Sequence, residues 1–436
     1  DEEIAAIKAK MAEIIAKDLP FSKVKMPKEE ALKLFKAKHQ TEKVQLLQGI
    51  ERFTYDIYFL DGKADTFYGP LAPSTGYLNI FDLTAFKEGF CLQYPMDGCS
   101  GNVLPMKRQS KLATALKEHS DWCSTMGVRG VGKLNSKVLS GEIIDLINLS
   151  EALHERKYAE IADQIYARRG SVKIVFIAGP SSSGKTSTSK RLALQCRILG
   201  LNPKVIELDN YFVEREQTPK DENGKYDFEC LEAMDLKLFD KQMSQLLAGE
   251  KVLMPTYNFG LGKKEFNETL QLGEKDILII EGIHALDNKI LTNIPREKKF
   301  KIYISPLTEL NLDEHNRIST TDNRLLRRII RDNRTRDYRV ERTLEQWPSV
   351  RAGEEKYIFP FQDDADATIN SAAIYEFGVL KTYVEPLLYS VDSNSPYYEE
   401  AKRLINLLKL FLPIPSDSIP EDAVLREFIG NSYFHE

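Results

Sequence analysis

The pattern of apolar and polar residues along the chain changes near residue 171. Beyond that point, short apolar runs alternate with amphipathic stretches, which predicts strands at 172–178, 203–208, 277–281 and 300–304 with helices between them. Because a helix follows each strand, the strands are expected to run parallel. The sequence therefore predicts an α/β fold, a parallel sheet with helices on both faces, that ends with a helix at 374–388.

The residues on either side of this region follow other patterns. Helical spacing at 3–17 and 28–38 and strand-like alternation at 53–60 predict a small α+β domain. Residues 397–412 have the spacing of a helix and precede a proline-containing tail. We therefore expect four parts: an α+β domain at 1–100, a mainly helical connector at 101–170, the α/β domain at 171–388, and a C-terminal helical extension at 389–436.

The segment Gly179–Thr186 reads Gly-Pro-Ser-Ser-Ser-Gly-Lys-Thr and matches G-x-x-x-x-G-K-[ST], the phosphate-binding loop (P-loop). Its glycines let backbone N–H groups close around phosphate oxygens, and the N-terminus of the helix predicted at 187–199 adds its dipole. The motif predicts that Lys185 reaches the β- and γ-phosphates and that the Thr186 hydroxyl binds Mg²⁺. The expected ATP-binding residues are Gly179, Ser181, Ser182, Ser183, Gly184, Lys185, Thr186 and Ser187.

A second segment, Gly127–Leu134, has the same spacing as far as Lys133. It ends in Leu134, whose side chain cannot bind a metal, and no convincing strand precedes it. We therefore interpret it as a turn.

Composition narrows the class of protein without adding a site. The 436 residues are 42% hydrophobic and 29% charged with a net charge of −5, so no global charge points to nucleic acid or to a membrane as a partner. The five cysteines have no close pairing, which fits free thiols in a reducing cytoplasm. Together with the six scattered histidines, they show no zinc-ligand spacing. No apolar run approaches the length of a membrane span.

Two acids follow predicted strands of the parallel sheet. Asp209 comes directly after the strand at 203–208, and Glu281 ends the strand at 277–281. In an open parallel sheet, ligands lie beyond the carboxyl ends of the strands. A carboxylate there can accept a proton from an attacking hydroxyl or help to hold Mg²⁺. We expect Asp209 to do the first, and Thr186 and Glu281, with Asp209, to form the metal site.

An arginine-rich segment follows the fourth predicted strand. Residues 322–332 contain Arg327, Arg328 and Arg331 at helical spacings of three and four, and Arg336 lies a few residues further on. Arginines that close over a transferring phosphoryl group neutralise its developing charge. A solvated helix face or a nucleic-acid patch would have the same composition, but the position after the fourth strand favours a mobile lid.

Taken together, these motifs resemble the uridine kinase/phosphoribulokinase family of P-loop kinases over about 171–385. The P-loop, Asp209-Asn210-Tyr211-Phe212, Tyr257-Asn258-Phe259, Ile280-Glu281-Gly282 and the arginine segment occur in the order typical of that family, as does Asp364–Ile369. The resemblance implies an ATP- and Mg²⁺-dependent nucleoside kinase. It implies a catalytic role for Lys185, Asp209, Arg328, Arg331 and Arg336, and substrate contacts from Asp209, Tyr211, Glu229, Tyr257 and Phe259.

The segments that bind the acceptor in uridine kinases are altered here. Asp227-Phe228-Glu229 stands where those enzymes carry an Asn-Phe-Asp-like segment, and Gly262 stands where they carry a histidine that contacts the base. The acceptor is therefore left open, with a sugar or sugar phosphate, as in phosphoribulokinase, as an enzymatic alternative. An ATP-sensing protein that binds RNA is a further alternative. No membrane or nucleic-acid partner is expected, and a homo-oligomer is compatible with the sequence.

Residues 65–76 resemble a stretch in the second N-terminal domain of threonyl-tRNA synthetases, and the similarity extends over about 10–95. Phe67 and Leu71 stand at positions where that domain carries Cys and His for editing chemistry or metal binding. The resemblance implies a retained scaffold without its chemistry, in which no zinc is expected. It also implies that the chain lacks the extreme N-terminus of a multidomain uridine kinase-like protein.

Overall fold

A computed structural model describes residues 2–87, 89–95, 101–106, 109–221, 224–308 and 310–434. The chain forms two compact units. The first unit contains residues 1–109 and 312–316, and the second contains residues 110–311 and 317–436. Among the described residues, no helix is both long enough and apolar enough to cross a membrane.

The second unit is built on a five-stranded sheet with the order β12-β11-β6-β10-β7. Every neighbouring pair in it is parallel, which confirms the predicted α/β class. The strands are β6 (Ile174–Ala178), β7 (Asn202–Glu207), β10 (Asp276–Glu281), β11 (Lys299–Ser305) and β12 (Ala367–Asn370). Because all five point the same way, the loops after them meet at one edge, where a ligand site is expected.

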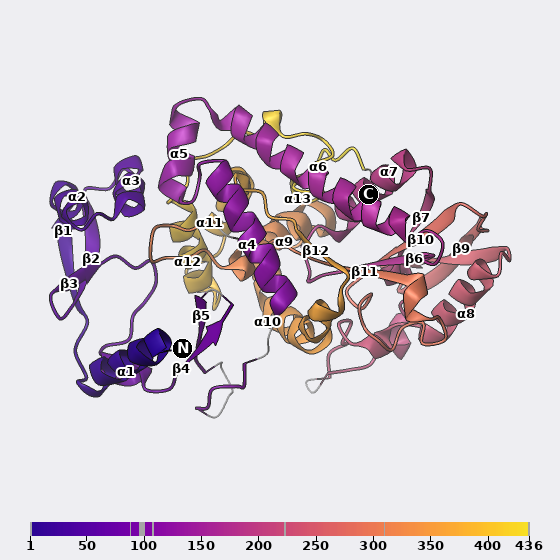
Figure 1. Ribbon diagram of the computed structural model, residues 1–436, viewed down its shortest axis with the longest axis horizontal. Helices are drawn as coiled ribbons and strands as arrows, with labels where there is room; N and C mark the ends of the chain where they lie inside the picture. The colour runs from indigo at the N-terminus through magenta and orange to yellow at the C-terminus, as the bar shows by residue number, and fades with distance from the viewer. Residues whose placement is uncertain are drawn as a thin grey trace. The chain divides into compact units, whose positions relative to one another are not determined.

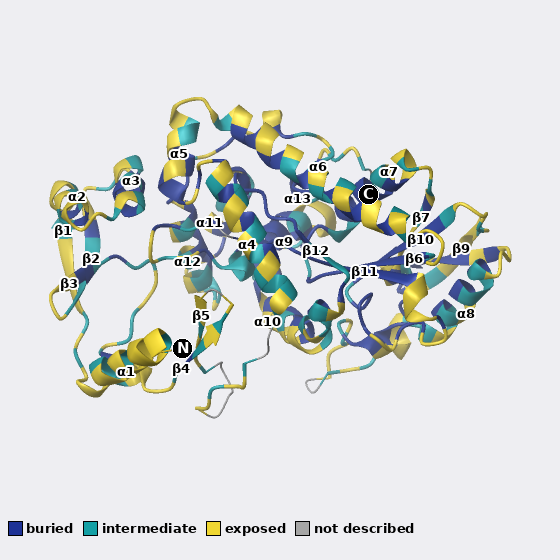
Figure 2. Cartoon of the chain, in the orientation of Figure 1, coloured by how far each residue is buried: buried dark blue, intermediate teal, exposed yellow. Residues whose placement is uncertain are grey.

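The two faces of this sheet are covered by different helices (Figure 1). Successive side chains of a strand point to opposite faces. Val175 and Ile177 therefore pack against α6 (Ile143–Ala167) and α7 (Lys185–Ile198). Ile174, Phe176 and Ala178 face the other core, which includes α8 (Leu236–Leu247). All five residues of β6 are buried, and Figure 2 shows the central strands as the most buried part of this unit.

Further elements of the second unit surround the carboxyl edge of the sheet. The hairpin of β8 (Val252–Asn258) and β9 (Lys263–Leu270) projects after α8. The arginine segment forms α9 (Thr320–Arg336), and α10 (Val340–Tyr357) follows it. The remaining helices are α4 (Ser110–Thr125), α5 (Val131–Leu139), α11 (Glu376–Tyr389), α12 (Tyr398–Leu408) and α13 (Arg426–Ile429).

The first unit is a small α+β structure. Its antiparallel sheet β1-β2-β3 consists of Ser22–Pro27, Thr54–Leu60 and Lys63–Asp65. The apolar sides of α2 (Lys28–Ala37) and α3 (Thr41–Gly49) pack on it through a core that includes Phe35, Leu47 and Ile57. The other elements are α1 (Glu2–Ala16) and the hairpin of β4 (Asp82–Phe86) and β5 (Gly89–Gln93).

A buried lysine lies at the centre of the first unit. The Lys43 ammonium has no exposed surface and forms ion pairs with the carboxylates of Asp65 and Asp313, the second at 3.8 Å. The Tyr68 hydroxyl donates to Asp313 at 3.3 Å. Burial lowers the pKa of Lys43, while the neighbouring Asp313 and Glu314 carboxylates oppose that shift. Segment 312–316, distant in sequence, thus supplies a partner for this charge. The proposed likeness of this unit to a synthetase domain stays a prediction.

Two expectations about single features can be compared with the structure. The second glycine-rich segment, 127–134, was predicted to be a turn, which is wrong for its second half: residues 131–134 form the start of α5. The element before it is the helix α4 and not a strand. No disulfide links the cysteines of the described residues, while Cys99, expected as a free thiol, lies outside them.

The buried histidines of the second unit lead to a prediction about acid stability. His119 and His154 both contact the Ala372 carbonyl through Nε2, at 3.3 and 3.2 Å. Burial lowers the pKa of His119 to about 4, with a smaller effect from His154. In the unfolded chain this histidine takes up a proton near its ordinary pKa of about 6.5, so stability falls as the pH drops from there towards 4.

We expect His119 to remove roughly 3 kcal/mol of unfolding free energy between pH 7 and pH 4. The variant His119→Gln keeps a donor for the Ala372 carbonyl but cannot titrate. Urea unfolding at several pH values should therefore show a smaller loss for the variant. Parallel pH profiles of the two proteins would contradict the assignment.

Candidate active site

The P-loop joins β6 to α7 in a conformation that two glycines permit. A Cβ on Gly179 would lie 2.0 Å from the Ile304 carbonyl oxygen, so only glycine fits against β11. Gly184 precedes α7 with a φ of 85°, in the left-handed region that favours glycine. The hydroxyls of Ser182 and Ser183 are buried without a hydrogen-bond partner among the described residues. The loop therefore holds unused donors at a helix N-terminus, as an anion site requires.

The Lys185 ammonium lies over the loop itself. Its Nζ donates to the carbonyl oxygens of Gly179 at 3.2 Å and Pro180 at 3.5 Å. Next to it, the Thr186 hydroxyl donates to Glu281 Oε1 at 2.6 Å. Glu281 ends β10, which pairs directly with β6. The parallel sheet thus brings together the hydroxyl and the carboxylate that the sequence predicts as metal ligands.

Asp209 lies just after β7, on the far side of β10 from the P-loop strand. Its residue is exposed to solvent, yet the surrounding protein atoms raise the pKa of its carboxyl. Lys185, Arg336 and Arg331 oppose that shift through their positive charges. These influences indicate that the predicted base lies within electrostatic reach of the P-loop lysine and of two predicted lid arginines.

Burial also affects the other carboxyls near the loop. It raises the pKa of Glu281 to about 8, with the Asp209 and Glu207 carboxylates adding to the shift and Lys185 and Thr186 opposing it. The Asp209 and Glu207 carboxylates and the Lys185 ammonium therefore lie within electrostatic reach of Glu281.

The predicted lid arginines share one acid that was not assigned a role from the sequence. Asp332 is completely buried and forms ion pairs with Arg328 at 3.2 Å, Arg331 at 2.9 Å and Arg336 at 3.4 Å. Arg328 also donates to the Ser181 hydroxyl at 2.9 Å. One carboxylate thus gathers the three cations beside the P-loop.

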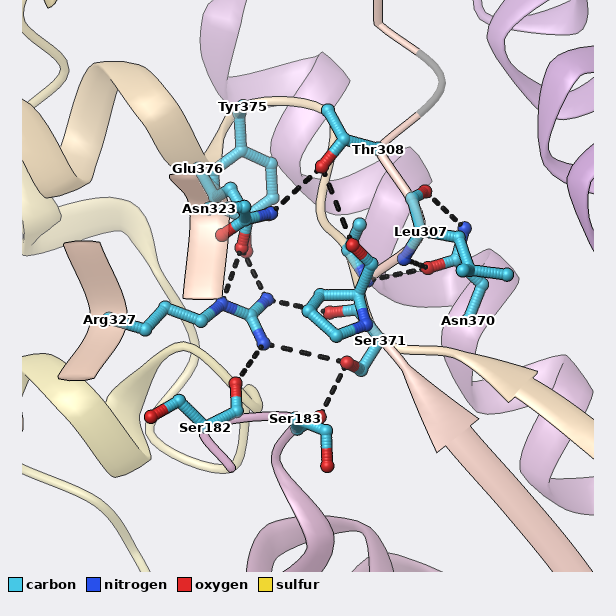
Figure 3. Close-up of polar contacts among 12 residues, drawn as sticks. Ser182, Ser183, Leu307, Thr308, Asn323, Arg327, Asn370, Ser371, Tyr375 and Glu376 are labelled. Carbon is cyan, nitrogen blue, oxygen red and sulfur yellow. Dashed lines mark hydrogen bonds and ion pairs between the residues drawn. The ribbon is translucent and has the colours of Figure 1, made fainter. Parts of the chain in front are cut away.

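Two further arginines of α9 donate hydrogen bonds to backbone carbonyls of the P-loop. Arg324 donates to the Ser181 carbonyl at 3.0 Å and pairs with Glu354 of α10, which itself accepts from the Ser181 N–H at 3.2 Å. Arg327 is completely buried and donates to the Ser182 carbonyl at 3.4 Å (Figure 3). The first half of α9 is therefore a scaffold for the loop, in addition to the lid function predicted for the helix.

Arg327 connects the P-loop to the loop after β12. Its guanidinium donates to the Ser371 carbonyl at 2.9 Å and pairs with Glu376, and the Ser371 hydroxyl donates to the Ser183 carbonyl at 2.5 Å. Figure 3 shows this guanidinium directed at Ser182 and Ser371, and the Ser371 hydroxyl directed at Ser183. The buried ion pair of Arg327 with Glu376 thus anchors the backbone of the P-loop.

We predict that Arg327→Met lowers the unfolding free energy by roughly 3–5 kcal/mol, because it leaves the Glu376 carboxylate buried and unpaired. Chemical denaturation measures this loss. Arg339→Met, at an exposed arginine of the same unit, should change stability by less than about 0.5 kcal/mol. Equal effects of the two substitutions would show that the network in Figure 3 does not support the fold.

The residues predicted to contact the substrate fall into two groups. Tyr211 is completely buried, donates to Gln242 Oε1 at 2.8 Å and packs on Phe239, so it belongs to the core, and its predicted substrate contact is not supported. Phe259 is exposed and contacts Tyr257, with ring centroids 5.0 Å apart. Burial raises the pKa of Glu229 to about 7, while Arg328 opposes the shift.

Sequence reasoning overlooked the acids that organise these arginines. Asp332 stands inside the arginine run, four residues after Arg328 and four before Arg336, and this spacing was a usable signal. Glu354 and Glu376 had no such signal, since each meets its arginine through the fold rather than through spacing along one helix.

Comparisons with known proteins agree with this geometry. Residues 174–376 match the model of the Phosphoribulokinase / Uridine kinase family. The uridine kinase of Macrococcus caseolyticus (strain JCSC5402) is 29% identical over 221 residues, which cover 49% of this chain and 97% of the relative. The uridine kinase of Staphylococcus carnosus (strain TM300) is 30% identical over 197 residues, which cover 45% and 86%.

Among solved structures, D-glycerate 3-kinase from Cryptococcus neoformans var. grubii serotype A aligns with 61% of this chain and 89% of its own, at 15% identity and a TM-score of 0.27. The assignment rests on the sequence relatives and on the family model, whose match at 174–376 contains the P-loop, Asp209, Glu281 and the arginine helix. The chain belongs to the phosphoribulokinase/uridine kinase family and is a P-loop kinase.

Proposed function

We propose that the protein transfers the γ-phosphoryl group of ATP to a hydroxyl of a nucleoside in the presence of Mg²⁺. The observation that carries this proposal is the position of Asp209. The Asp209 carboxyl, on a residue exposed to solvent, lies within electrostatic reach of Lys185, Arg331 and Arg336. A base near the cations that would hold the phosphates is the arrangement that phosphoryl transfer needs.

The residues at the end of β10 fit a magnesium ion. Mg²⁺ prefers oxygen ligands and commonly takes one or two from the protein, with water and phosphate completing its shell. The Thr186 hydroxyl and the Glu281 carboxylate, 2.6 Å apart, offer such a pair. When bound there, the ion would neutralise charge on the β- and γ-phosphates.

In the proposed reaction, the acceptor oxygen forms a bond to the γ-phosphorus while the bond to the β,γ-bridging oxygen breaks and releases ADP. Asp209 accepts the proton of the acceptor hydroxyl. Lys185 and the arginines gathered by Asp332 stabilise the charge that develops on the transferring group. The network behind the P-loop holds the backbone donors in place during this change.

An aromatic cluster supports a nucleoside as the acceptor. Phe212 contacts Tyr257, Phe259 and Phe228 with centroid separations of 5.7, 6.2 and 6.0 Å. Phe228 and Phe259 leave 37% and 57% of their surface exposed. A nucleobase can stack on an exposed ring, and such stacking contributes about 1–3 kcal/mol per base. The neighbouring Glu229 can hydrogen-bond to ribose hydroxyls.

A phosphorylated sugar is a second candidate because of Arg215. A Cβ on Gly262 would lie 2.8 Å from the Arg215 Cβ and 3.0 Å from its Nε. Arginine therefore fills the space beside the position where the histidine of uridine kinases is expected. Its guanidinium also donates to the Phe259 carbonyl. A cation at this place would suit an anionic acceptor.

A screen for acceptor-dependent ADP release tests both candidates. Nucleosides, sugars, sugar phosphates and tRNA are added separately to the full chain with ATP and Mg²⁺. With a nucleoside acceptor, Phe259→Ala should raise KM at least tenfold and Arg215→Ala should have little effect. The reverse pattern, with a sugar phosphate as the active acceptor, would replace the proposed substrate class by the second candidate. Turnover stimulated by tRNA alone would contradict both.

A further inference from the structure

The C-terminal segment 423–429 lies against the P-loop, although it follows the end of the family match at residue 376. Four of its residues are at most 3% exposed: Ala423, Val424, Leu425 and Phe428. The α13 helix in this segment packs against α9, as Figure 1 also shows. A part of the chain outside the shared catalytic region thus reaches the site.

Glu427 places a carboxylate on the first turn of α7. Its Oε2 accepts from the Ser187 backbone N–H at 3.0 Å and from the Ser187 hydroxyl at 2.8 Å. Ser187 is the third residue of this helix, and the N–H groups of a first turn have no partner within the helix. They are the donors that a P-loop offers to the phosphates of a nucleotide.

The same segment covers the glycine that precedes α7. A Cβ on Gly184 would lie 2.3 Å from Val424 Cγ1, so Val424 fills the space directly above the loop. The segment is also anchored: Arg334 of α9 donates to the carbonyl oxygens of Glu427 at 2.9 Å and Phe428 at 3.2 Å. The Arg327 guanidinium lies 4.9 Å from the centroid of the Phe428 ring.

We infer that Glu427 is an internal competitor for the phosphate donor: its carboxylate occupies the Ser187 donors, and ATP must displace segment 423–429 to use them. Two anions cannot accept the same two hydrogen bonds, and a carboxylate that remained beside a phosphate would repel it. The apparent affinity for ATP is then the intrinsic affinity multiplied by the fraction of molecules in which the segment is already displaced.

The position of Ser187 indicates which part of the donor is affected. Lys185 and Thr186 serve the β- and γ-phosphates and their metal ion, and Ser187 follows them along the helix. The carboxylate therefore competes with the phosphates farther from the transferred group. Its effect should appear in donor binding and KM, with the chemical step largely unchanged once ATP is bound. This inference depends on the proposed function only in taking ATP as the donor.

The test is a calorimetric titration of the full chain with ATP and Mg²⁺, without an acceptor. Glu427→Gln keeps the shape of the side chain and removes its charge, and Glu427→Ala removes both. Because a hydrogen bond to a charged group is worth about ten- to a hundredfold in an equilibrium, both variants should bind ATP at least about tenfold more tightly than wild type. Glu421→Gln, an exposed acid in the same part of the chain, should leave the affinity unchanged.

Hydrogen exchange of the wild-type chain provides a second measurement that needs no variant to fold. Saturating ATP and Mg²⁺ should increase exchange at the amides of residues 423–429. Unchanged or weaker ATP binding by both Glu427 variants, or unchanged exchange in wild type that has bound ATP, would overturn the competitor assignment and leave the proposed donor intact. Failure of wild type and both variants to bind ATP would contradict the donor as well.

Discussion

Lys185→Ala should abolish phosphoryl transfer and leave the protein folded. The ammonium lies on the P-loop, where it donates to the Gly179 and Pro180 carbonyls at 3.2 and 3.5 Å, and it forms no ion pair within 4.0 Å among the described residues. Its loss removes a positive charge expected to act on the transferring group. This costs at least about 3 kcal/mol of transition-state stabilisation, which lowers the rate by a factor of roughly a hundred or more.

Steady-state turnover with a saturating acceptor measures this effect, and circular dichroism reports on the fold. Lys251→Ala, at an exposed lysine of the same unit, is the matched control and should keep full activity. A Lys185→Ala enzyme that retains more than a tenth of wild-type turnover would show that this lysine does not hold the phosphates.

Asp209→Asn should lower kcat by at least two decades while ATP binding stays within a few-fold of wild type. General-base catalysis contributes about 10²–10⁴ in rate, and asparagine cannot accept the proton of the acceptor hydroxyl. The two effects should separate because the proposed metal ligands are Thr186 and Glu281, whose hydrogen bond does not involve Asp209.

Glu207→Gln provides the comparison for Asp209. Glu207 ends β7 only two residues earlier, and burial raises its pKa, with the Asp209 and Glu427 carboxylates adding to the shift. Because Glu207 is not the expected base, its substitution should reduce kcat by much less than Asp209→Asn. Equal losses of ATP affinity and turnover in Asp209→Asn would instead identify Asp209 as a metal ligand or a structural residue.

The central strands β6 and β10 could be predicted from the sequence because burial on both faces makes each of them a short, mostly apolar run. The strand predicted at 277–281 is β10 at Asp276–Glu281, and that at 203–208 is β7 at Asn202–Glu207. The proximity of Thr186 and Glu281 followed from the same reasoning, since parallel strands place their carboxyl ends together, while their role as metal ligands stays a prediction. Local pattern and topology were sufficient for these features.

The structural role of the buried arginines of α9 could not be predicted in this way. A run of arginines on a helix is usually solvated or acts on a ligand, yet Arg324 and Arg327 are at most 1% exposed. Their burial is tolerated only because Glu354 and Glu376 pair with them, and these acids lie 30 and 49 residues further along the chain. Such long-range pairs leave no periodic signal.

The C-terminal tail was similarly opaque. Its prolines and mixed composition indicate an irregular extension, and nothing in its sequence marks Glu427 as a partner of Ser187, which lies 240 residues earlier.

For Tyr211, the sequence predicted a substrate contact that the structure does not support. Tyr211 lies two residues after Asp209, the proposed base, but its ring points into the core, where the hydroxyl has a buried acceptor in Gln242.

The proposed phosphoryl transfer is tested most directly by following the γ-phosphoryl group itself. The full chain is incubated with γ-labelled ATP, Mg²⁺ and a nucleoside, and the products are separated and counted, with Lys185→Ala as the blank. Label should move from ATP into a nucleoside monophosphate, in an amount equal to the ADP formed, and the blank should show no transfer. Label that remains in ATP or appears only as inorganic phosphate, with every nucleoside supplied, would contradict the proposed transfer.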